Sequence, residues 1–231
     1  MRGQVLDALG EERHLYFRGA CVAFVAGVLP DQGLFRFLGQ QTCSFDFLYL
    51  SSGVKVARGG GSSNLPALVL LSGLPGTGKT TFAAKLAPRL AALVLESDRV
   101  RRELFPRRRY TRKESGQVFA VVRERAEAAL GEGRSVIIDA TNLREGERRG
   151  FRELAAGQGA PVVAVRLTAP DAVVRERLSG VREGASEANV GVYNRMRGQE
   201  EPFGIPCVQV DSRYCLEASV ALAAALCRGE A

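Results

Sequence analysis

The chain has 231 residues, 46% of them hydrophobic and 25% charged, with a formal net charge of +7. That length and composition suit one substantial soluble domain, or one domain with an appendage. The longest early apolar run, residues 20–29, is too short to span a bilayer, and the five cysteines form no CxxC pair, which argues against a membrane protein and against a structural zinc site.

The positive charge comes mostly from arginine, a residue suited to bidentate contacts with phosphate, and it weakly favours an anionic partner. Glu11 and Glu12 lie where a secretory signal would need a basic stretch. We therefore expect a cytoplasmic protein without membrane association, whose thiols are reduced and mostly buried.

A glycine- and serine-rich stretch, residues 59–64, is predicted to be a flexible linker. It ends an N-terminal extension, residues 1–64, and precedes a domain that spans residues 65–231. Within the extension, residues 44–50 alternate imperfectly between apolar and polar side chains, as a strand would. The extension is either a small appended β-rich element or the product of an upstream start codon.

Beyond residue 65, short apolar runs alternate with segments of helical periodicity. Buried strands separated by helices are typical of a parallel sheet covered on both faces, so the prediction is an α/β fold. Ligands of such sheets bind beyond the carboxyl ends of the strands. Strands are expected at residues 67–71, 93–95, 135–138, 162–167 and 207–210, and helices at residues 79–91, 113–130, 144–157, 171–178, 186–197 and 216–227.

The run from Gly73 to Thr80, GLPGTGKT, matches the phosphate-binding pattern GxxxxGK[ST] in full. Its glycines let successive backbone N–H groups point at phosphate oxygens at the start of a helix. Lys79 would reach the β- and γ-phosphates of ATP, and the Thr80 hydroxyl would bind Mg²⁺. Because a strand is expected before the run and a helix after it, the fold is predicted to be a P-loop NTPase three-layer sandwich. The residues expected to contact ATP are Gly73, Leu74, Pro75, Gly76, Thr77, Gly78, Lys79, Thr80 and Thr81.

Two further predicted strands end in aspartates. Asp98 follows the strand at 93–95, where we expect it to cap the next helix and to accept the proton of a substrate hydroxyl. Arg101 lies one helical turn later and would hold a phosphate of the acceptor. Asp139 closes the strand at 135–138 and is predicted to hold Mg²⁺ through water. The structural alternative is an ordinary helix cap at Asp98 with a solvated Arg101.

The densest basic patch follows Asp98 and comprises Arg99, Arg101, Arg102 and the run 107–112. Such runs are usually solvated surfaces, but this one lies on the acceptor side of the expected crevice. It favours a phosphate-bearing or polyanionic acceptor, contacted by Arg101 and Arg102, and Tyr110 could stack on a base or ring. Asn142 starts the loop after Asp139 and would touch either the cap of the next helix or the substrate.

A helix followed by a Gly/Ser-rich stretch places Arg177 and Arg182 where a lid over ATP is expected. Either arginine could supply positive charge to the transferring phosphoryl group. The alternative is an amphipathic surface helix with exposed arginines.

Several stretches together resemble the P-loop kinase domains of the polynucleotide 5′-hydroxyl kinase group, which bacterial AAA-family kinase-like ATP-binding proteins share. They are GLPGTGKTTFAAKLA, ESDRVRREL, GRSVIIDATNLREGERRGFRELA and SEANVGVYNRM, within residues 65–212. The resemblance implies that Asp98 is the general base, that Arg101 contacts acceptor phosphate, and that a lid arginine stabilises the transition state. Because Arg177 and Arg182 are five positions apart, it does not choose between them. Some members of the group are related to zeta-toxin-like sugar-nucleotide kinases.

The leading hypothesis is an ATP- and Mg²⁺-dependent phosphotransferase that moves the γ-phosphoryl group to a hydroxyl acceptor. The acceptor is either a nucleic-acid 5′-hydroxyl, which the basic patch slightly favours, or a small molecule or sugar nucleotide. The alternative from another class is an ATP-binding or ATPase regulatory module without phosphotransfer. A GTPase is disfavoured because the sequence contains no NKxD guanine-reading motif.

Overall fold

The computed structural model describes residues 65–180 and 188–230, together with the backbone of four short strands nearer the N-terminus. The predicted linker 59–64 and most of the strand-like stretch 44–50 lie outside the described residues. The division into residues 1–64 and 65–231 therefore stays a prediction. The four strands are β1 (Arg2–Leu6) and β2 (Glu12–Tyr16), which pair antiparallel, and β3 (Ala26–Gly27) and β4 (Tyr49–Leu50), which pair parallel.

Between residues 65 and 230 the described chain builds one five-stranded sheet, in the order β6-β7-β5-β8-β9. All its pairings are parallel, which confirms the predicted α/β fold. Each strand ends at a polar residue one position beyond the predicted end, since backbone pairing continues past the last apolar side chain. The strands are β5 (Leu68–Ser72), β6 (Leu93–Glu96), β7 (Val136–Asp139), β8 (Val162–Thr168) and β9 (Val208–Asp211).

Six of the seven helices described between residues 65 and 230 lie close to the predicted ranges, and the second helix, at Ser97–Leu104, had no predicted range. The sixth helix begins later than expected, because the Asn189 side chain accepts a hydrogen bond from the Val192 amide and caps the helix there. The second helix is short and strongly amphipathic. The helices are α1 (Lys79–Leu90), α2 (Ser97–Leu104), α3 (Arg112–Gly131), α4 (Glu145–Gly157), α5 (Asp171–Ser179), α6 (Val190–Met196) and α7 (Glu217–Cys227).

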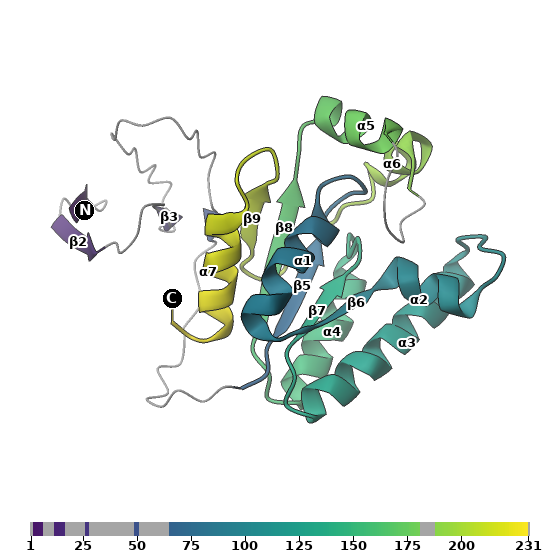
Figure 1. The fold of residues 1–231 in the computed structure, drawn as a ribbon, viewed down its shortest axis with the longest axis horizontal. Coiled ribbons are helices and arrows are strands. Elements are labelled where there is room, and N and C mark those ends of the chain that lie inside the picture. Colours follow the sequence, from purple (N-terminus) through teal and green to yellow (C-terminus); the bar gives the residue numbers. More distant parts are fainter. Residues whose placement is uncertain are drawn as a thin grey trace.

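The sheet is covered on both faces, which makes three layers (Figure 1). Successive side chains of β5 alternate between the faces. Leu68 and Leu70 pack with side chains of α3 and α4, whereas Val69 and Leu71 pack with side chains of α1 and α7. Every residue of β5 is buried, and each large apolar side chain buried this way contributes roughly 1.5–3 kcal/mol to folding. β5 is therefore a firm support for the loop that follows it.

α5 and α6 lie beyond the carboxyl ends of the strands (Figure 1). They carry a small apolar cluster of their own, built on Val174, Leu178 and Tyr193. Among the described helices, none combines the length and the apolarity that crossing a membrane requires.

Candidate active site

A cavity of about 1710 Å³ opens at the carboxyl edge of the sheet. The loop after β5 forms one side of it, and α2, α3, the β7–α4 loop and α6 form the others. Pockets for one small ligand usually measure about 300–1,000 Å³. This cavity can therefore hold a nucleotide and a second ligand together, at the edge where the parallel sheet predicts a site.

The loop from Gly73 to Thr80, called the phosphate loop below, joins β5 to α1. Gly76 and Gly78 have left-handed φ values of 82° and 89°, and Gly78 is the N-cap of α1. Gly73 has a φ of 145°, and a Cβ there would lie 2.3 Å from the carbonyl oxygen of Leu167. Only glycine adopts these conformations without strain. The loop therefore curls into the N-terminus of α1, where backbone N–H groups are suited to bind a phosphate.

Lys79 folds back over the phosphate loop. Its Nζ donates hydrogen bonds of 2.9 Å to the Gly73 carbonyl and 3.0 Å to the Leu74 carbonyl. Six residues of the predicted ATP-contacting run line the cavity, whereas Gly73, Leu74 and Thr77 do not. The six are Pro75, Gly76, Gly78, Lys79, Thr80 and Thr81.

Thr80 and Asp139 meet at the floor of the cavity. The Thr80 hydroxyl donates a 2.7 Å hydrogen bond to Oδ2 of Asp139, which is 6% exposed. Burial raises the pKa of Asp139, and the charge of Lys79 and the Thr80 hydrogen bond oppose that rise. A hydroxyl and a carboxylate are oxygen donors of the kind that Mg²⁺ binds, so the pair fits the predicted metal site.

Glu96 stands beside Asp139 and was not among the predicted site residues. It is the last residue of β6 and is the register partner of Asp139 on β7. It lines the cavity, and its pKa is raised by burial and by the charge of Asp139. Its position at the end of an apolar strand is the signal that could have identified it.

Asp98 lines the cavity, but it does not cap a helix as predicted. β6 passes directly into α2, whose N-cap is Glu96, so Asp98 falls within the first helical turn. Burial raises the pKa of Asp139, and the negative charge of Asp98 adds to that rise. A carboxylate in a first helical turn is favoured by the helix dipole and needs no other partner. Asp98 is therefore stabilised in the first turn of α2, where it lines the cavity.

Arg101 is 7% exposed and lies at the α2–α3 side of the cavity. Its guanidinium carbon is 4.8 Å from the centre of the Tyr110 ring, Nη2 donates to Ser115 Oγ at 3.2 Å, and Nη1 is 3.8 Å from the Glu114 carboxylate. In the described part of the chain, its Nε and Nη1 atoms are buried without a hydrogen-bond acceptor. Such donors are costly to bury, so an acceptor that reached them from the cavity would be bound favourably.

The basic patch after Asp98 is not one continuous binding surface. Arg109, Tyr110 and Arg112 line the cavity, whereas Arg102 is exposed and does not. The position of Arg102 gives no support to its predicted substrate contact, because the next residue along a helix turns about 100° away from Arg101. Tyr110, which we expected to stack on a ligand, covers the guanidinium of Arg101.

Asn142 has neither of its predicted roles. It is 0% exposed, its Nδ2 donates a 2.7 Å hydrogen bond to the Leu71 carbonyl, and it does not line the cavity. Nor does it cap α4, whose N-cap is Arg144. Asn142 has a left-handed φ of 43°, and it ties the end of β7 to β5 beneath the phosphate loop.

Arg177 lines the cavity from α5 and joins the phosphate loop to the end of β9. Nη1 donates a 2.7 Å hydrogen bond to Ser212 Oγ and a 3.3 Å hydrogen bond to the Gly76 carbonyl. Nη2 donates a 2.9 Å hydrogen bond to the Ser212 carbonyl. Ser212 follows the last strand, and we assigned no role to that strand end from the sequence. Arg182, the other candidate lid arginine, lies outside the described residues.

Solved structures of kinases share this fold. A sugar kinase from Janibacter sp. HTCC2649 matches with a TM-score of 0.55 and 22% identity, over 70% of this chain and 94% of its own. A gluconokinase from Sinorhizobium meliloti 1021 matches with a TM-score of 0.53 and 20% identity, over 72% of this chain and 92% of its own. The Mycobacterium tuberculosis APS kinase CysC, in complex with AMPPNP and APS, matches with a TM-score of 0.53 and 18% identity, over 68% of this chain and 94% of its own. These likenesses show the P-loop kinase fold, and none of the three is described as a polynucleotide kinase.

Curated relatives occur in mycobacteria. Uncharacterized protein Rv2004c of M. tuberculosis (strain ATCC 25618 / H37Rv) and uncharacterized protein Mb2027c of M. bovis (strain ATCC BAA-935 / AF2122/97) are each 31% identical over 137 residues. The match covers 54% of this chain and only 28% of each relative, so it spans less than a third of their length.

The AAA_33 family, described as an AAA domain, matches residues 68–203. The matched region runs from β5 through the phosphate loop and α6, so it contains Lys79, Thr80, Asp98 and Asp139. Because it covers more than half of the chain, the protein belongs to the AAA_33 family of AAA domains.

Proposed function

We propose that this protein is an ATP- and Mg²⁺-dependent phosphotransferase that moves the γ-phosphoryl group of ATP to a hydroxyl of a small anionic acceptor. One observation carries the proposal: the phosphate loop, the Thr80–Asp139 pair and Asp98 all open onto one cavity large enough for two ligands. The family match and the kinase fold support the same reaction class.

The nucleotide half of the site is the phosphate loop with its floor. Backbone N–H groups of the loop would hold the phosphates, and Lys79 would exchange its two carbonyl acceptors for phosphate oxygens. Thr80 and Asp139 would hold Mg²⁺, which neutralises phosphate charge when it is bound. Arg177 keeps the loop against Ser212.

The acceptor half lies beside α2 and α3. Asp98 would accept the hydroxyl proton as the acceptor oxygen bonds to the γ-phosphorus and ADP leaves. The buried Nε and Nη1 of Arg101 would bind an anionic group of the acceptor. Arg109 and Arg112 add positive charge on the same side.

A small acceptor suits the shape of the site. Helices and loops surround the cavity on several sides, and Arg102 and Arg107 do not line it. The solved kinases of this fold are described as acting on a sugar, gluconate and APS, which supports a small acceptor. A nucleic-acid 5′-hydroxyl is the second candidate, favoured by the 50% exposure of Tyr110 beside Arg109 and Arg112.

The test is transfer of label from [γ-³²P]ATP to matched pairs of alcohols that differ only in one anionic group, such as glycerol and glycerol 3-phosphate or glucose and glucose 6-phosphate. A 5′-hydroxyl oligonucleotide forms a third arm. We expect label on anionic small molecules and little on their neutral partners. Label on the oligonucleotide alone would select the second candidate, and ATP binding without label on any acceptor would select a regulatory ATPase module.

A further inference from the structure

Two segments far apart in the sequence meet at one side of the cavity. They are the β7–α4 loop, residues 141–144, and the segment after α6, residues 198–203, and together we call them the clamped wall. The Glu201 amide donates to the Leu143 carbonyl at 2.9 Å, and the Glu145 amide donates to Glu201 Oε2 at 2.7 Å. Both segments contribute cavity-lining residues, among them Leu143, Gln199 and Glu201.

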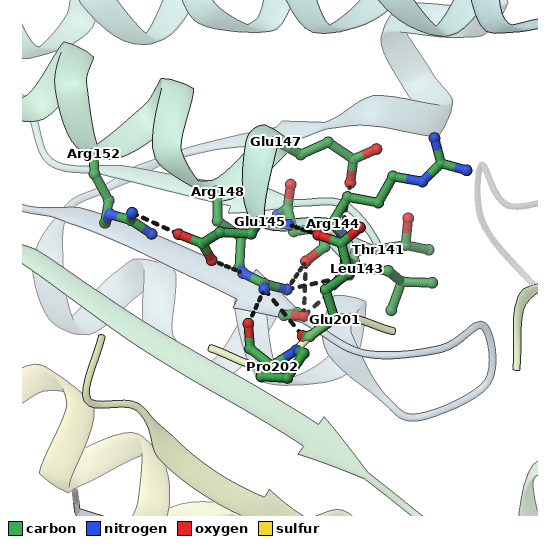
Figure 2. Close-up of polar contacts among 11 residues, drawn as sticks. Thr141, Leu143, Arg144, Glu145, Glu147, Arg148, Arg152, Glu201 and Pro202 are labelled. Carbon is green, nitrogen blue, oxygen red and sulfur yellow. Dashed lines mark hydrogen bonds and ion pairs between the residues drawn. The ribbon is translucent and has the colours of Figure 1, made fainter. Parts of the chain in front are cut away.

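Arg148 lies behind this wall and binds both segments (Figure 2). Nη1 donates to the carbonyls of Asn142 and Leu143 at 3.0 and 2.8 Å. Nη2 donates to the carbonyls of Glu201 and Pro202, and Nε donates to Glu145. A guanidinium has five N–H donors, and here each has an acceptor.

Arg148 is also fully enclosed. Its side chain is 0% exposed, and its guanidinium carbon lies 4.3 Å from the centre of the Phe203 ring. Glu145 supplies the neighbouring negative charge at 3.0 Å. Because four of the five acceptors are backbone carbonyls, the contact fixes the path of the chain rather than the rotamer of one side chain. Lysine, with three donors on a single atom, could not satisfy the same set.

We infer that Arg148 is a positioning residue that holds the clamped wall in place, and that this wall bounds the acceptor half of the cavity together with α2 and α3. This inference rests on the proposed phosphotransferase function. The Gly73 amide donates to the Thr141 carbonyl of the clamped wall at 3.0 Å, but the phosphate loop also has supports that do not involve Arg148, the Arg177–Ser212 contact and the core strand β5. Loss of the Arg148 contacts should therefore raise the KM for the acceptor more than the KM for ATP.

The experiment compares Arg148→Lys and Arg148→Met with Arg152→Met as the matched control. Arg152 lies one turn later on α4 and pairs with Glu145 at 2.6 Å. No contact of Arg152 with residues 198–203 is present in the described part of the chain. We expect the KM for the acceptor identified by the label-transfer panel to rise about tenfold in Arg148→Lys, because buried carbonyls lose their donors. The KM for ATP should stay within about twofold, and Arg152→Met should leave both values unchanged.

A second readout needs no acceptor. Hydrogen exchange of the peptide covering residues 199–204 should be at least about tenfold faster in both Arg148 variants than in the wild type and in Arg152→Met. If Arg148→Met does not fold, Arg148→Lys and Phe203→Leu, which removes the stacked ring, give the same comparison.

The inference fails if residues 199–204 exchange at the wild-type rate in the Arg148 variants. It also fails if the KM for ATP rises as much as that for the acceptor, or if the acceptor KM does not change. A wild-type protein that labels no acceptor would instead refute the phosphotransferase, and the exchange rates would then decide whether Arg148 clamps the wall.

Discussion

The hydroxyl of Thr80 donates a 2.7 Å hydrogen bond to the carboxylate of Asp139, although 59 positions separate the two residues in the sequence. The bond joins the first turn of α1 to the last residue of β7. It places a hydroxyl and a buried carboxylate together at the point where the phosphate loop ends, as the predicted Mg²⁺ site requires.

Asp139→Asn should make the metal-free protein more stable at neutral pH. Burial raises the pKa of Asp139 in the folded state, so the folded protein holds a proton that the unfolded chain releases. Wild-type stability therefore falls as the pH rises from the ordinary aspartate range through the raised pKa, and an amide escapes that loss. Thermal unfolding of both proteins in EDTA across a pH series measures the difference.

The gain from Asp139→Asn should vanish at low pH, where the carboxyl is protonated in both states. Adding Mg²⁺ should stabilise the wild type and not the variant. A difference that is the same at every pH would contradict this account.

Asp98→Asn should slow phosphoryl transfer about 10²- to 10⁴-fold, the usual contribution of a general base. The affinity for an ATP analogue should stay within about twofold, since phosphate binding rests on the loop after β5. Glu103→Gln is the matched control on α2, because Glu103 pairs with Arg125 at 2.8 Å and does not line the cavity. Unchanged activity in Asp98→Asn would favour the regulatory ATPase alternative.

Arg177 and Ser212 should behave as one unit. Arg177→Met and Ser212→Ala each remove the 2.7 Å hydrogen bond between the two side chains, so their effects on the free energy of unfolding should not add. We expect an interaction energy of about 1 kcal/mol in urea unfolding. Arg175, which pairs with Asp171 on the same helix, supplies the comparison, and Arg175→Met with Ser212→Ala should be additive.

Gly73→Ala should destabilise the fold by about 2–4 kcal/mol in urea unfolding. The new Cβ would lie 2.3 Å from the Leu167 carbonyl oxygen at a φ of 145°. Gly157→Ala is the control, because no atom lies within 4 Å of a Cβ there and Gly157 is the last residue of α4. That substitution should be neutral or stabilising by up to about 1 kcal/mol.

Cysteine labelling should separate the three cysteines of the described residues. Burial raises the pKa of Cys227 to about 12, and Cys207 is also buried, whereas Cys215 is exposed. Since the thiolate is the reactive form, iodoacetamide at pH 8 should modify Cys215 long before the other two. Peptide mapping by mass spectrometry follows the order, and early modification of Cys227 would show that α7 does not stay packed on the sheet.

Much of the fold follows from local pattern. Apolar runs and a single glycine motif predicted the parallel sheet, because strands covered on both faces need nearly continuous apolar sequence. The phosphate loop was equally predictable, since its glycines and Lys79 act through neighbours in the chain. The hydrophobic pattern predicted the strand ends less well, because backbone pairing extends to polar residues such as Glu96. Glu96 therefore takes the N-cap position of α2, and Asp98 lies within the helix.

Contacts between distant segments were not predictable in the same way. Asn142 has the sequence position of a loop residue, yet its amide reaches the Leu71 carbonyl, 71 positions away. Arg148 sits in an amphipathic helix, where an arginine is normally solvated, and its burial depends on carbonyls 53 and 54 positions later. Such partners become visible only when the chain is folded.

The strand order has an evolutionary consequence. β5 and β7, which carry the phosphate loop and Asp139, are interior strands, whereas Asp98 and Arg101 follow β6 at the margin of the sheet. Changes to the helices that follow an edge strand disturb few neighbours, whereas changes to an interior strand disturb the strands on both sides and both layers of helices. Under the proposed function, substitutions in α2 and α3 can therefore alter the choice of acceptor during evolution, with the phosphate loop and Asp139 inherited intact.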